Sequence, residues 1–357
     1  MPDNKTAQQA RLQEQAIMFA NRLAKRIKHL TKWAQRTNAG AFRLYDRDIP
    51  EIPLALDYYI DAKSGDCVSG ALYQRPYEKD ANEEEIWLNA MCKAASDALG
   101  IDSARIFIKL RERQRGTHQY EKQSDLAVTR IITEKGLRFR VNLSDYLDTG
   151  LFPDRRLLRA RIRQDAEDKK VLNLFSYTGS FSIAAAAGGA AATCSVDLSN
   201  TYCNWAQENF SLNKIKSHVI DTGEYWAAYK HKAHALVRAD VLVFLKQARI
   251  KSCTWDVIVL DPPGFSNSKK MIDTLDLRRD HLKLLEQCLA LLAPGGTLWF
   301  SVNAKNFRES ARDLEAVLRE KFPKVSVTDV TRRLVDEDFR GRKTPGTFLI
   351  VLDSCKL

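Results

Sequence analysis

The sequence predicts an α/β protein in which a seven-stranded, mostly parallel sheet follows a small α+β domain and an N-terminal helix. Residues 7–36 carry apolar side chains every three or four positions, as an amphipathic helix does. Short β-like runs surround one helical run between residues 42 and 141. Beyond Pro153, apolar runs alternate with helical ones in the manner of βαβ units. We therefore expect domains at residues 1–40, 41–153 and 154–357.

The composition is that of a globular protein, with 45% hydrophobic and 28% charged residues among 357. Lysine and arginine outnumber aspartate and glutamate by 56 to 45, and this net charge of +11 favours a polyanionic partner such as nucleic acid. The seven cysteines never form C-x-x-C, which indicates a reducing compartment and argues against a zinc site. No apolar signal segment opens the chain. We expect a cytoplasmic protein with no metal and no membrane span.

The N-terminal helix carries a basic stripe. Its four members fall three or four residues apart, so they share one helix face, which is either a solvated surface or an RNA contact. Asn38, Ala39 and Gly40 then supply a stop signal. The members of the stripe are Lys25, Lys28, Lys32 and Arg36.

The small domain is expected to have strands at residues 54–60, 105–110, 126–133 and 137–141 around a helix at 82–99. A basic segment within it, together with arginines near the start of the third domain, could track phosphates, and a solvated surface is the alternative. These residues are Lys109, Arg111, Arg113, Arg115, Arg155 and Arg159.

The large domain is expected to have strands at residues 171–175, 193–196, 235–238, 256–260, 297–302, 325–330 and 347–352. The first ends in a loop containing Gly179, and the second ends at Asp197, an acid placed to accept both ribose hydroxyls of a nucleoside cofactor. A dinucleotide would need a glycine-rich phosphate turn, and G-x-G-x-x-G is absent. S-adenosylmethionine carries no phosphate, so one glycine suffices. Asp240, after the third strand, could hold an adenine amino group or cap a helix.

The fourth strand ends in Asp261-Pro262-Pro263-Gly264-Phe265, beside the switch point where α/β sheets bind ligands. Together, Gly179, Asp197 and Asp261 predict a Rossmann-like class I S-adenosylmethionine methyltransferase. A nicotinamide dehydrogenase is disfavoured because the phosphate loop is missing.

The residues also narrow the atom that is methylated. Enzymes that act on exocyclic amines place an aromatic residue directly after the prolines, whereas Gly264 intervenes here. No cysteine lies in the loop after the fourth strand, or in the segment Ser301-Val302-Asn303-Ala304 at the end of the fifth, so C5 chemistry on cytosine lacks its nucleophile. Guanine N7 has a free lone pair and needs only in-line positioning, without a covalent intermediate. On this hypothesis Asp261 would oppose the charge that develops on the ring. An N2-guanine or other RNA base methyltransferase, or a catalytically silent RNA-binding ribosome-assembly protein, stays open.

The chain resembles a known family along almost its whole length. FANRLAKRIKHLTKWA (from Phe19), KLRERQRGTHQYEK (from Lys109), VLNLFSYTGSFS (from Val171) and DPPGFSNSKKM (from Asp261) carry the resemblance. The chain is similar to the guanine-N7 methyltransferase half of the bifunctional large-subunit ribosomal RNA methyltransferases of bacteria, here as a stand-alone protein. The resemblance implies S-adenosylmethionine as cofactor, and 23S rRNA or a large-subunit assembly intermediate as partner.

The resemblance also implies roles for individual residues. Two departures bear on the target base: family members usually have Thr at Gly264, and a histidine typical near Gly346 is missing. The catalytic residues would be Asp261, Pro262, Pro263, Phe265 and Asn303. The cofactor-binding residues would be Asp154, Arg156, Phe175, Ser176, Tyr177, Thr178, Gly179, Asp197, Leu198, Asp240, Val241 and Asp261.

Overall fold

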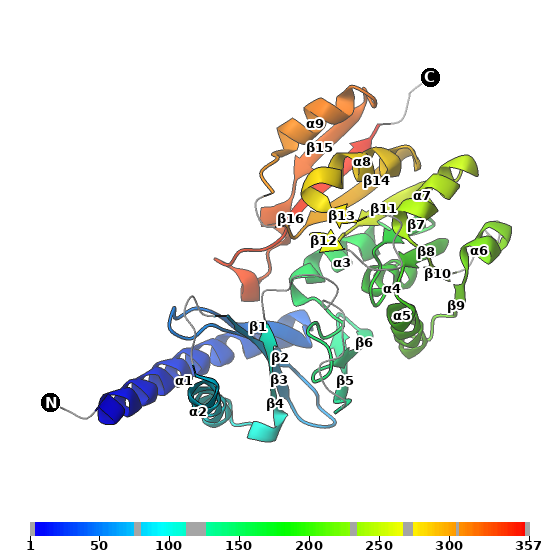
Figure 1. The fold of residues 1–357 in the computed structure, drawn as a ribbon. Helices are drawn as coiled ribbons and strands as arrows, with labels where there is room; N and C mark the ends of the chain where they lie inside the picture. The colour runs from blue at the N-terminus through cyan, green and yellow to red at the C-terminus, as the bar shows by residue number, and fades with distance from the viewer. Residues whose placement is uncertain are drawn as a thin grey trace. The chain divides into compact units, whose positions relative to one another are not determined.

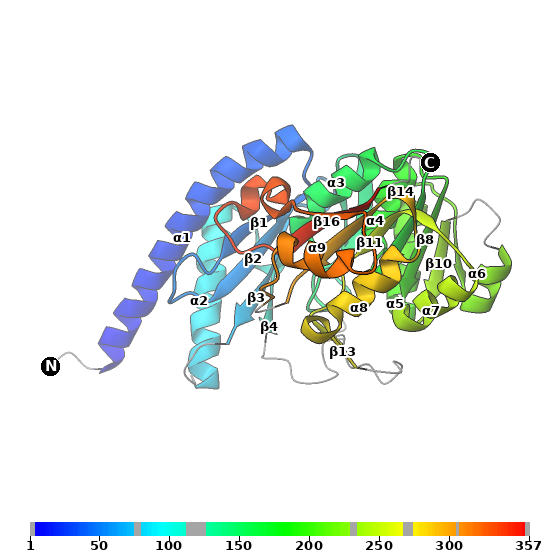
Figure 2. The ribbon, with the colours of Figure 1, turned by 90° about the horizontal axis from the view of Figure 1, so that it is seen from above.

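The structure, a computed structural model, describes residues 4–74, 80–111, 126–228, 234–266, 274–304 and 307–353. The chain divides into two compact units (Figures 1 and 2). Unit 1 comprises Met1–Gly136, Arg140–Pro153 and Glu337–Arg342, and unit 2 comprises Leu137–Phe139, Asp154–Asp336 and Lys343–Leu357. Unit 1 thus contains both the expected N-terminal helix and most of the expected small domain.

Unit 1 is built on a four-stranded sheet in the order β1-β2-β3-β4, in which β3 and β4 are parallel and the other pairs antiparallel. Strands β1 and β3 were not among the predicted strands. A register shift between Arg43 and Tyr45 interrupts β1, and Ser69 and Gly70 interrupt the apolar pattern of β3. The elements are α1 (Asn4–Thr37), β1 (Ala41–Asp46), β2 (Leu54–Tyr59), β3 (Cys67–Tyr73), α2 (Ala81–Leu99), η1 (Ser103–Arg105), β4 (Ile106–Arg111), β5 (Thr129–Glu134) and the part of β6 (Leu137–Asn142) from Arg140 onward. Strands β5 and β6 form a separate two-stranded sheet.

The apolar faces of α1 and α2 pack with the four-stranded sheet into one core. Phe19 and Leu23 of α1, Phe42 of β1, and Trp87 and Met91 of α2 are all buried in it. Figure 2 shows the two helices alongside this sheet. Burial of this apolar area is the main force that holds the long helix to the unit.

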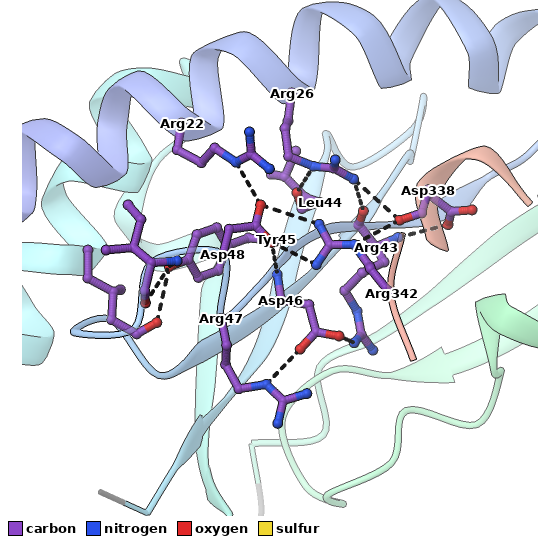
Figure 3. A network of polar contacts seen from close by, with 12 residues as sticks. Arg22, Arg26, Arg43, Leu44, Tyr45, Asp46, Arg47, Asp48, Asp338 and Arg342 are labelled. Atoms are coloured by element: carbon purple, nitrogen blue, oxygen red, sulfur yellow. Dashed lines mark hydrogen bonds and ion pairs between the residues drawn. The ribbon is translucent and has the colours of Figure 1, made fainter. Parts of the chain in front are cut away.

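A polar network attaches η5 (Glu337–Phe339), far along the chain, to the same unit (Figure 3). Asp338 is fully buried, and its Oδ2 accepts a hydrogen bond of 2.9 Å from the backbone N–H of Arg43. Arg342 pairs with Asp48 at 2.9 Å. Buried polar groups require hydrogen bonds and buried charges require partners, so these contacts fix the segment at its place in unit 1.

Unit 2 contains an eight-stranded sheet in the order β15-β16-β14-β11-β7-β8-β10-β9. All neighbours are parallel except β16, which is antiparallel to β14 and β15. The seven expected strands are present, but the expected strand number was wrong because β9, a short and half-exposed edge strand, was missed. The strands are β7 (Lys170–Leu174), β8 (Ala192–Asp197), β9 (Ser217–Ile220), β10 (His234–Arg238), β11 (Trp255–Leu260), β14 (Leu292–Val302), β15 (Val325–Asp329) and β16 (Gly346–Leu352).

Helices cover both faces of this sheet. Phe244, Leu284 and Leu314, from α7, α8 and α9, belong to the core on one face, and Leu158 and Phe181, from α3 and α4, belong to the core on the other. No helix in the described ranges combines the length and the apolar character needed to cross a membrane. The helices are α3 (Arg156–Gln164), α4 (Ser180–Ala187), α5 (Asn200–Leu212), α6 (Thr222–Ala228), α7 (Val241–Ile250), α8 (Leu277–Leu289) and α9 (Ala311–Arg319), with η3 (Pro153–Arg155), η4 (Thr331–Leu334) and the short pair β12 (Phe265–Ser266) and β13 (Leu275–Asp276) between them.

The close approach of α3 and α4 generates a stability prediction. A Cβ at Gly188 would lie 2.0 Å from the backbone oxygen of Arg163, so one helix would have to move. We expect Gly188→Ala to lower the free energy of unfolding by about 1–3 kcal/mol. At Gly346 the nearest atom to a Cβ is a Phe348 ring carbon at 3.6 Å, so Gly346→Ala is the matched control. Denaturant unfolding of both variants checks this; equal stabilities would contradict it.

Candidate functional site

The predicted site residues follow neighbouring parallel strands of unit 2. In the sheet register Leu174 of β7 lies opposite Val196 of β8 and Leu260 of β11, so these strands end level with one another. Because parallel neighbours end at the same edge, the loops that follow them gather there. That edge receives Gly179 after β7, Asp197 at the end of β8, Asp240 after β10, Asp261 after β11 and Asn303 after β14.

The loop after β7 has an unusual backbone. Phe175 and Tyr177 have φ of +55° and +50°, and Gly179 has +75°. Left-handed conformations are uncommon in non-glycine residues, and such residues cluster at functional sites. The N–H of Ser176 donates to the carbonyl of Val196 at 3.0 Å, which holds the loop along the sheet edge. The loop therefore presents backbone groups close to the ends of β7 and β8.

Gly179 and a buried asparagine hold the far end of this loop. A Cβ at Gly179 would lie 3.0 Å from the Cβ of Ala206 on α5. One turn along α5, Asn209 is fully buried and its Nδ2 donates to the carbonyl of Thr178 at 3.1 Å. Asn209 was not among the predicted site residues. The available signal was a polar residue on the same helix face as Ala206, which packs inward.

Asp197 joins the loop to the end of β8. Its Oδ2 accepts the N–H of Tyr177 and its Oδ1 the N–H of Ser199, both at 2.9 Å. Burial raises the pKa of Asp197 to about 6, although backbone donors, including that of Leu198, oppose the rise. The carboxylate thus sits among backbone N–H groups with acceptor capacity left for hydroxyl donors.

Asp240 both caps α7 and keeps one oxygen available. Its Oδ1 accepts the N–H groups of Leu242 at 2.8 Å and Val243 at 3.4 Å, as expected of an N-cap. Its buried Oδ2 has no hydrogen-bond partner in the described part of the chain. A buried oxygen without a donor is costly, so a ligand amino group would fit here. Val241 is buried in the core and leaves little surface for a ligand.

Asp261 is held by a buried arginine at the start of α3. Nε of Arg155 donates to Oδ2 of Asp261 at 3.1 Å and Nη2 to Oδ1 at 2.9 Å, a bidentate ion pair. Nη1 of Arg155 lies 3.5 Å from Oδ2 of Asp154. Burial by itself would lower the pKa of Arg155, but the two carboxylates outweigh it and raise the pKa. The negative charge of Asp261 is therefore paired with Arg155, and its expected role opposite the reacting ring stays a prediction.

The loop after β11 lies next to the loop after β14. A Cβ at Gly264 would sit 3.4 Å from the backbone oxygen of Asn303, an ordinary van der Waals distance. The N–H of Leu277, at the start of α8, donates to the carbonyl of Gly264 at 3.1 Å. Pro262 is buried, whereas Phe265 is 46% exposed, so its ring is available to a partner. The structure thus brings together the loops of the predicted catalytic residues.

Three of the predicted basic site residues are buried. Arg156, expected to bind the cofactor, is fully buried and donates from Nη1 to Asp336 at 2.8 Å. Arg155 and Arg159, expected to contact phosphates, are also buried. Long basic side chains were assumed to face solvent, whereas these three extend into unit 2.

Among the predicted RNA-binding residues of unit 1, some are exposed and one is buried. Lys109 is buried, its Nζ donates to the carbonyl of Tyr146, and burial lowers its pKa to about 8, so it does not present a surface charge to phosphate. Arg113, Arg115 and the side chain of Arg111 lie outside the described residues. The stripe on α1 is exposed at all four positions: Lys25, Lys28, Lys32 and Arg36.

Comparisons with known proteins agree with this architecture. The model of the family described as S-adenosylmethionine-dependent methyltransferase matches residues 68–331. The chain is 45% identical to "Ribosomal RNA large subunit methyltransferase K" of Neisseria meningitidis serogroup B, over 91% of this chain and 84% of that protein. It is 42% identical to "Ribosomal RNA large subunit methyltransferase K/L" of Hahella chejuensis over 92% of this chain, and spans 42% of that relative's length.

Solved structures share the fold. A crystal structure of SMU.776 complexed with SAH superposes with a TM-score of 0.70 at 24% identity, covering 94% of this chain and 81% of that one. Among the described residues, no group of three or more histidine, cysteine or acidic side chains could hold a metal ion.

The burial of Asp197 predicts a pH dependence of stability. Because its pKa is raised to about 6 in the folded protein, folding retains a proton that the unfolded chain releases near pH 4. The contribution of Asp197 to stability should fall as the pH rises from about 4 to about 6 and then stay constant. Relative to Asp197→Asn, the wild type should lose on the order of 1–2 kcal/mol over this window. Urea unfolding at several pH values checks this, and a parallel pH dependence of the two proteins would contradict it.

Proposed function

We propose, since this chain belongs to the S-adenosylmethionine-dependent methyltransferases, that it methylates N7 of a specific guanine in 23S ribosomal RNA. The observation that carries the substrate class is the 45% identity to a ribosomal RNA large subunit methyltransferase K, which this chain matches over most of both lengths. The K/L relatives are more than twice as long as the matched region. Only the guanine-N7 methylation is therefore proposed for this chain.

The residues at the sheet edge fit the cofactor. The loop 175–179 would surround its methionine portion, Asp197 would accept the two ribose hydroxyls, and the unpartnered Oδ2 of Asp240 would accept the adenine amino group. Leu198, half-buried at the end of β8, would cover one face of the adenine. When bound, the cofactor supplies a methyl group on a sulfonium, which is electrophilic without further activation.

The loop after β11 favours a ring nitrogen over an amine. Methylation of an exocyclic amine requires acceptors aimed at its hydrogens, and the carboxylate of Asp261 is aimed at the guanidinium of Arg155. Guanine N7 carries no hydrogen, so the protein needs only to place its lone pair in line with the methyl group. The exposed ring of Phe265 would stack on the flipped or single-stranded base.

The substrate is either free 23S rRNA or a large-subunit assembly intermediate in the cytoplasm. The exposed stripe on α1 would contact its phosphates, which provides affinity but no choice of sequence. The choice of base would then come from the loops at the sheet edge.

The proposed function predicts the loss of one modification. Ribosomal RNA from a strain that lacks this gene should lose one N7-methylguanosine, measured as a missing borohydride- and aniline-sensitive cleavage. The wild-type gene should restore the site, and Asp197→Ala should not. Loss of a methylated exocyclic amine instead, seen by mass spectrometry of nuclease digests, would identify an amine methyltransferase. An unchanged set of modifications would contradict the proposal altogether.

If the basic stripe on α1 contacts RNA phosphates, removing its charges should change how rRNA binding depends on salt concentration. Replacing Lys25, Lys28, Lys32 and Arg36 by Gln should weaken rRNA binding and reduce the slope of log K against log salt by about 2–3, because fewer counterions are released. The control variant removes four other exposed cations, Lys246, Arg249, Lys251 and Arg319. Filter-binding titrations at several salt concentrations compare the two. Equal slopes would show that the stripe on α1 is only a solvated face.

A further inference from the structure

The ion pair between Arg155 and Asp261 is built on two rigid segments. Arg155 ends η3 and immediately precedes α3, and Asp261 immediately follows β11. The side chain of Arg155 is 8% exposed and that of Asp261 17% exposed, so little water competes for these hydrogen bonds. Both donors of the fork engage, one for each carboxylate oxygen. Such bidentate geometry fixes orientation as well as distance.

Asp261 transmits this orientation to the loop. Pro262 and Pro263 follow it directly, and their rings fix φ in both residues. Few rotations therefore separate the clamped carboxylate from Gly264, whose carbonyl accepts the N–H of Leu277 at 3.1 Å. The loop is held at its first residue by Arg155 and at Gly264 by the start of α8. Phe265 is the next residue along.

We propose that Arg155 is a positioning residue for methyl transfer, which acts through Asp261 to set the loop 261–265 in line with the methyl donor. This inference rests on the proposed function. It replaces the expectation that Arg155 contacts phosphate, because a buried guanidinium whose fork is occupied by Asp261 does not reach the RNA backbone. Arg155 therefore affects the rate of methyl transfer within the complex of enzyme, methyl donor and RNA, and not the binding of either substrate.

Lysine cannot reproduce this clamp. An ammonium group is a compact point charge without the planar fork, so it would keep the charge balance of Asp261 but lose the two-point orientation. Arg155→Lys therefore separates charge from geometry. Arg155→Gln removes both.

The experiment measures single-turnover methyl transfer to rRNA by the full-length protein. Arg155→Lys and Arg155→Gln should each lower the maximal rate about a hundredfold, the size of effect that misplacement of reacting groups produces. The Kd of S-adenosylhomocysteine by calorimetry and the KM for RNA should stay within about threefold of wild type. Arg319→Gln, which removes an exposed ion pair with Glu315 on α9, should leave the rate unchanged.

A double-mutant cycle shows whether Arg155 acts through Asp261. Asp261→Asn alone should lower the rate, and adding Arg155→Gln to it should change the rate by less than about threefold, because the clamp is already lost. Multiplicative effects of the two substitutions would overturn the proposal.

Three further outcomes would contradict the positioning role of Arg155. A fully active Arg155→Lys variant would overturn the inference, and so would an effect confined to the KM for RNA, which would make Arg155 a phosphate contact. Loss of folded protein in both Arg155 variants, seen by circular dichroism, would make the residue structural only. A wild-type protein that methylates no rRNA overturns the proposed function and this inference with it, whereas an active wild type beside an active Arg155→Lys variant overturns this inference alone.

Discussion

A guanidinium removed from water needs a carboxylate, and this constraint organises the active edge of the sheet. Arg155 meets the requirement with both oxygens of Asp261, and its neighbour Arg156 meets it with Asp336. Leaving either charge unpaired would cost several kcal/mol. The first turn of α3 is consequently fixed to the loop after β11 and to the segment that leads toward the end of the chain. The pair of Arg155 with Asp261 also holds the loop that is proposed to face the target base.

Apart from the pair of Arg155 and Asp261, the candidate site is shaped mainly by backbone geometry. The left-handed residues Phe175 and Tyr177 turn the loop after β7 along the ends of the strands, and Asp197 holds it there through the N–H of Tyr177. A reaction in which a lone pair attacks an activated methyl group needs orientation more than acid or base catalysis. An edge made of short, anchored loops suits this demand.

The two units divide the work that the proposed function requires. The described residues proposed to bind the cofactor and place the base belong to unit 2, whereas the exposed basic stripe belongs to α1 of unit 1. Within unit 1, the hydrogen bond from the backbone N–H of Arg43 to Asp338 makes a distant segment part of the same folded body as α1. Binding of RNA and catalysis can therefore be altered separately by substitution.

The sequence by itself determined the α/β class, the seven strands with a clear apolar pattern, and the order of Gly179, Asp197 and Asp261 along the chain. Hydrophobic periodicity and loop motifs are local properties, so they can be seen without a structure. The tertiary structure decided which basic residues are surface charges and which are buried clamps. Asp261 is 106 residues from Arg155 and Asp336 is 180 residues from Arg156. Lys109, likewise, is buried against the carbonyl of Tyr146. The local sequence around an arginine or lysine does not specify whether it is buried. The carboxylate or carbonyl that stabilises the buried charge lies far away in the sequence and is brought close only when the chain folds.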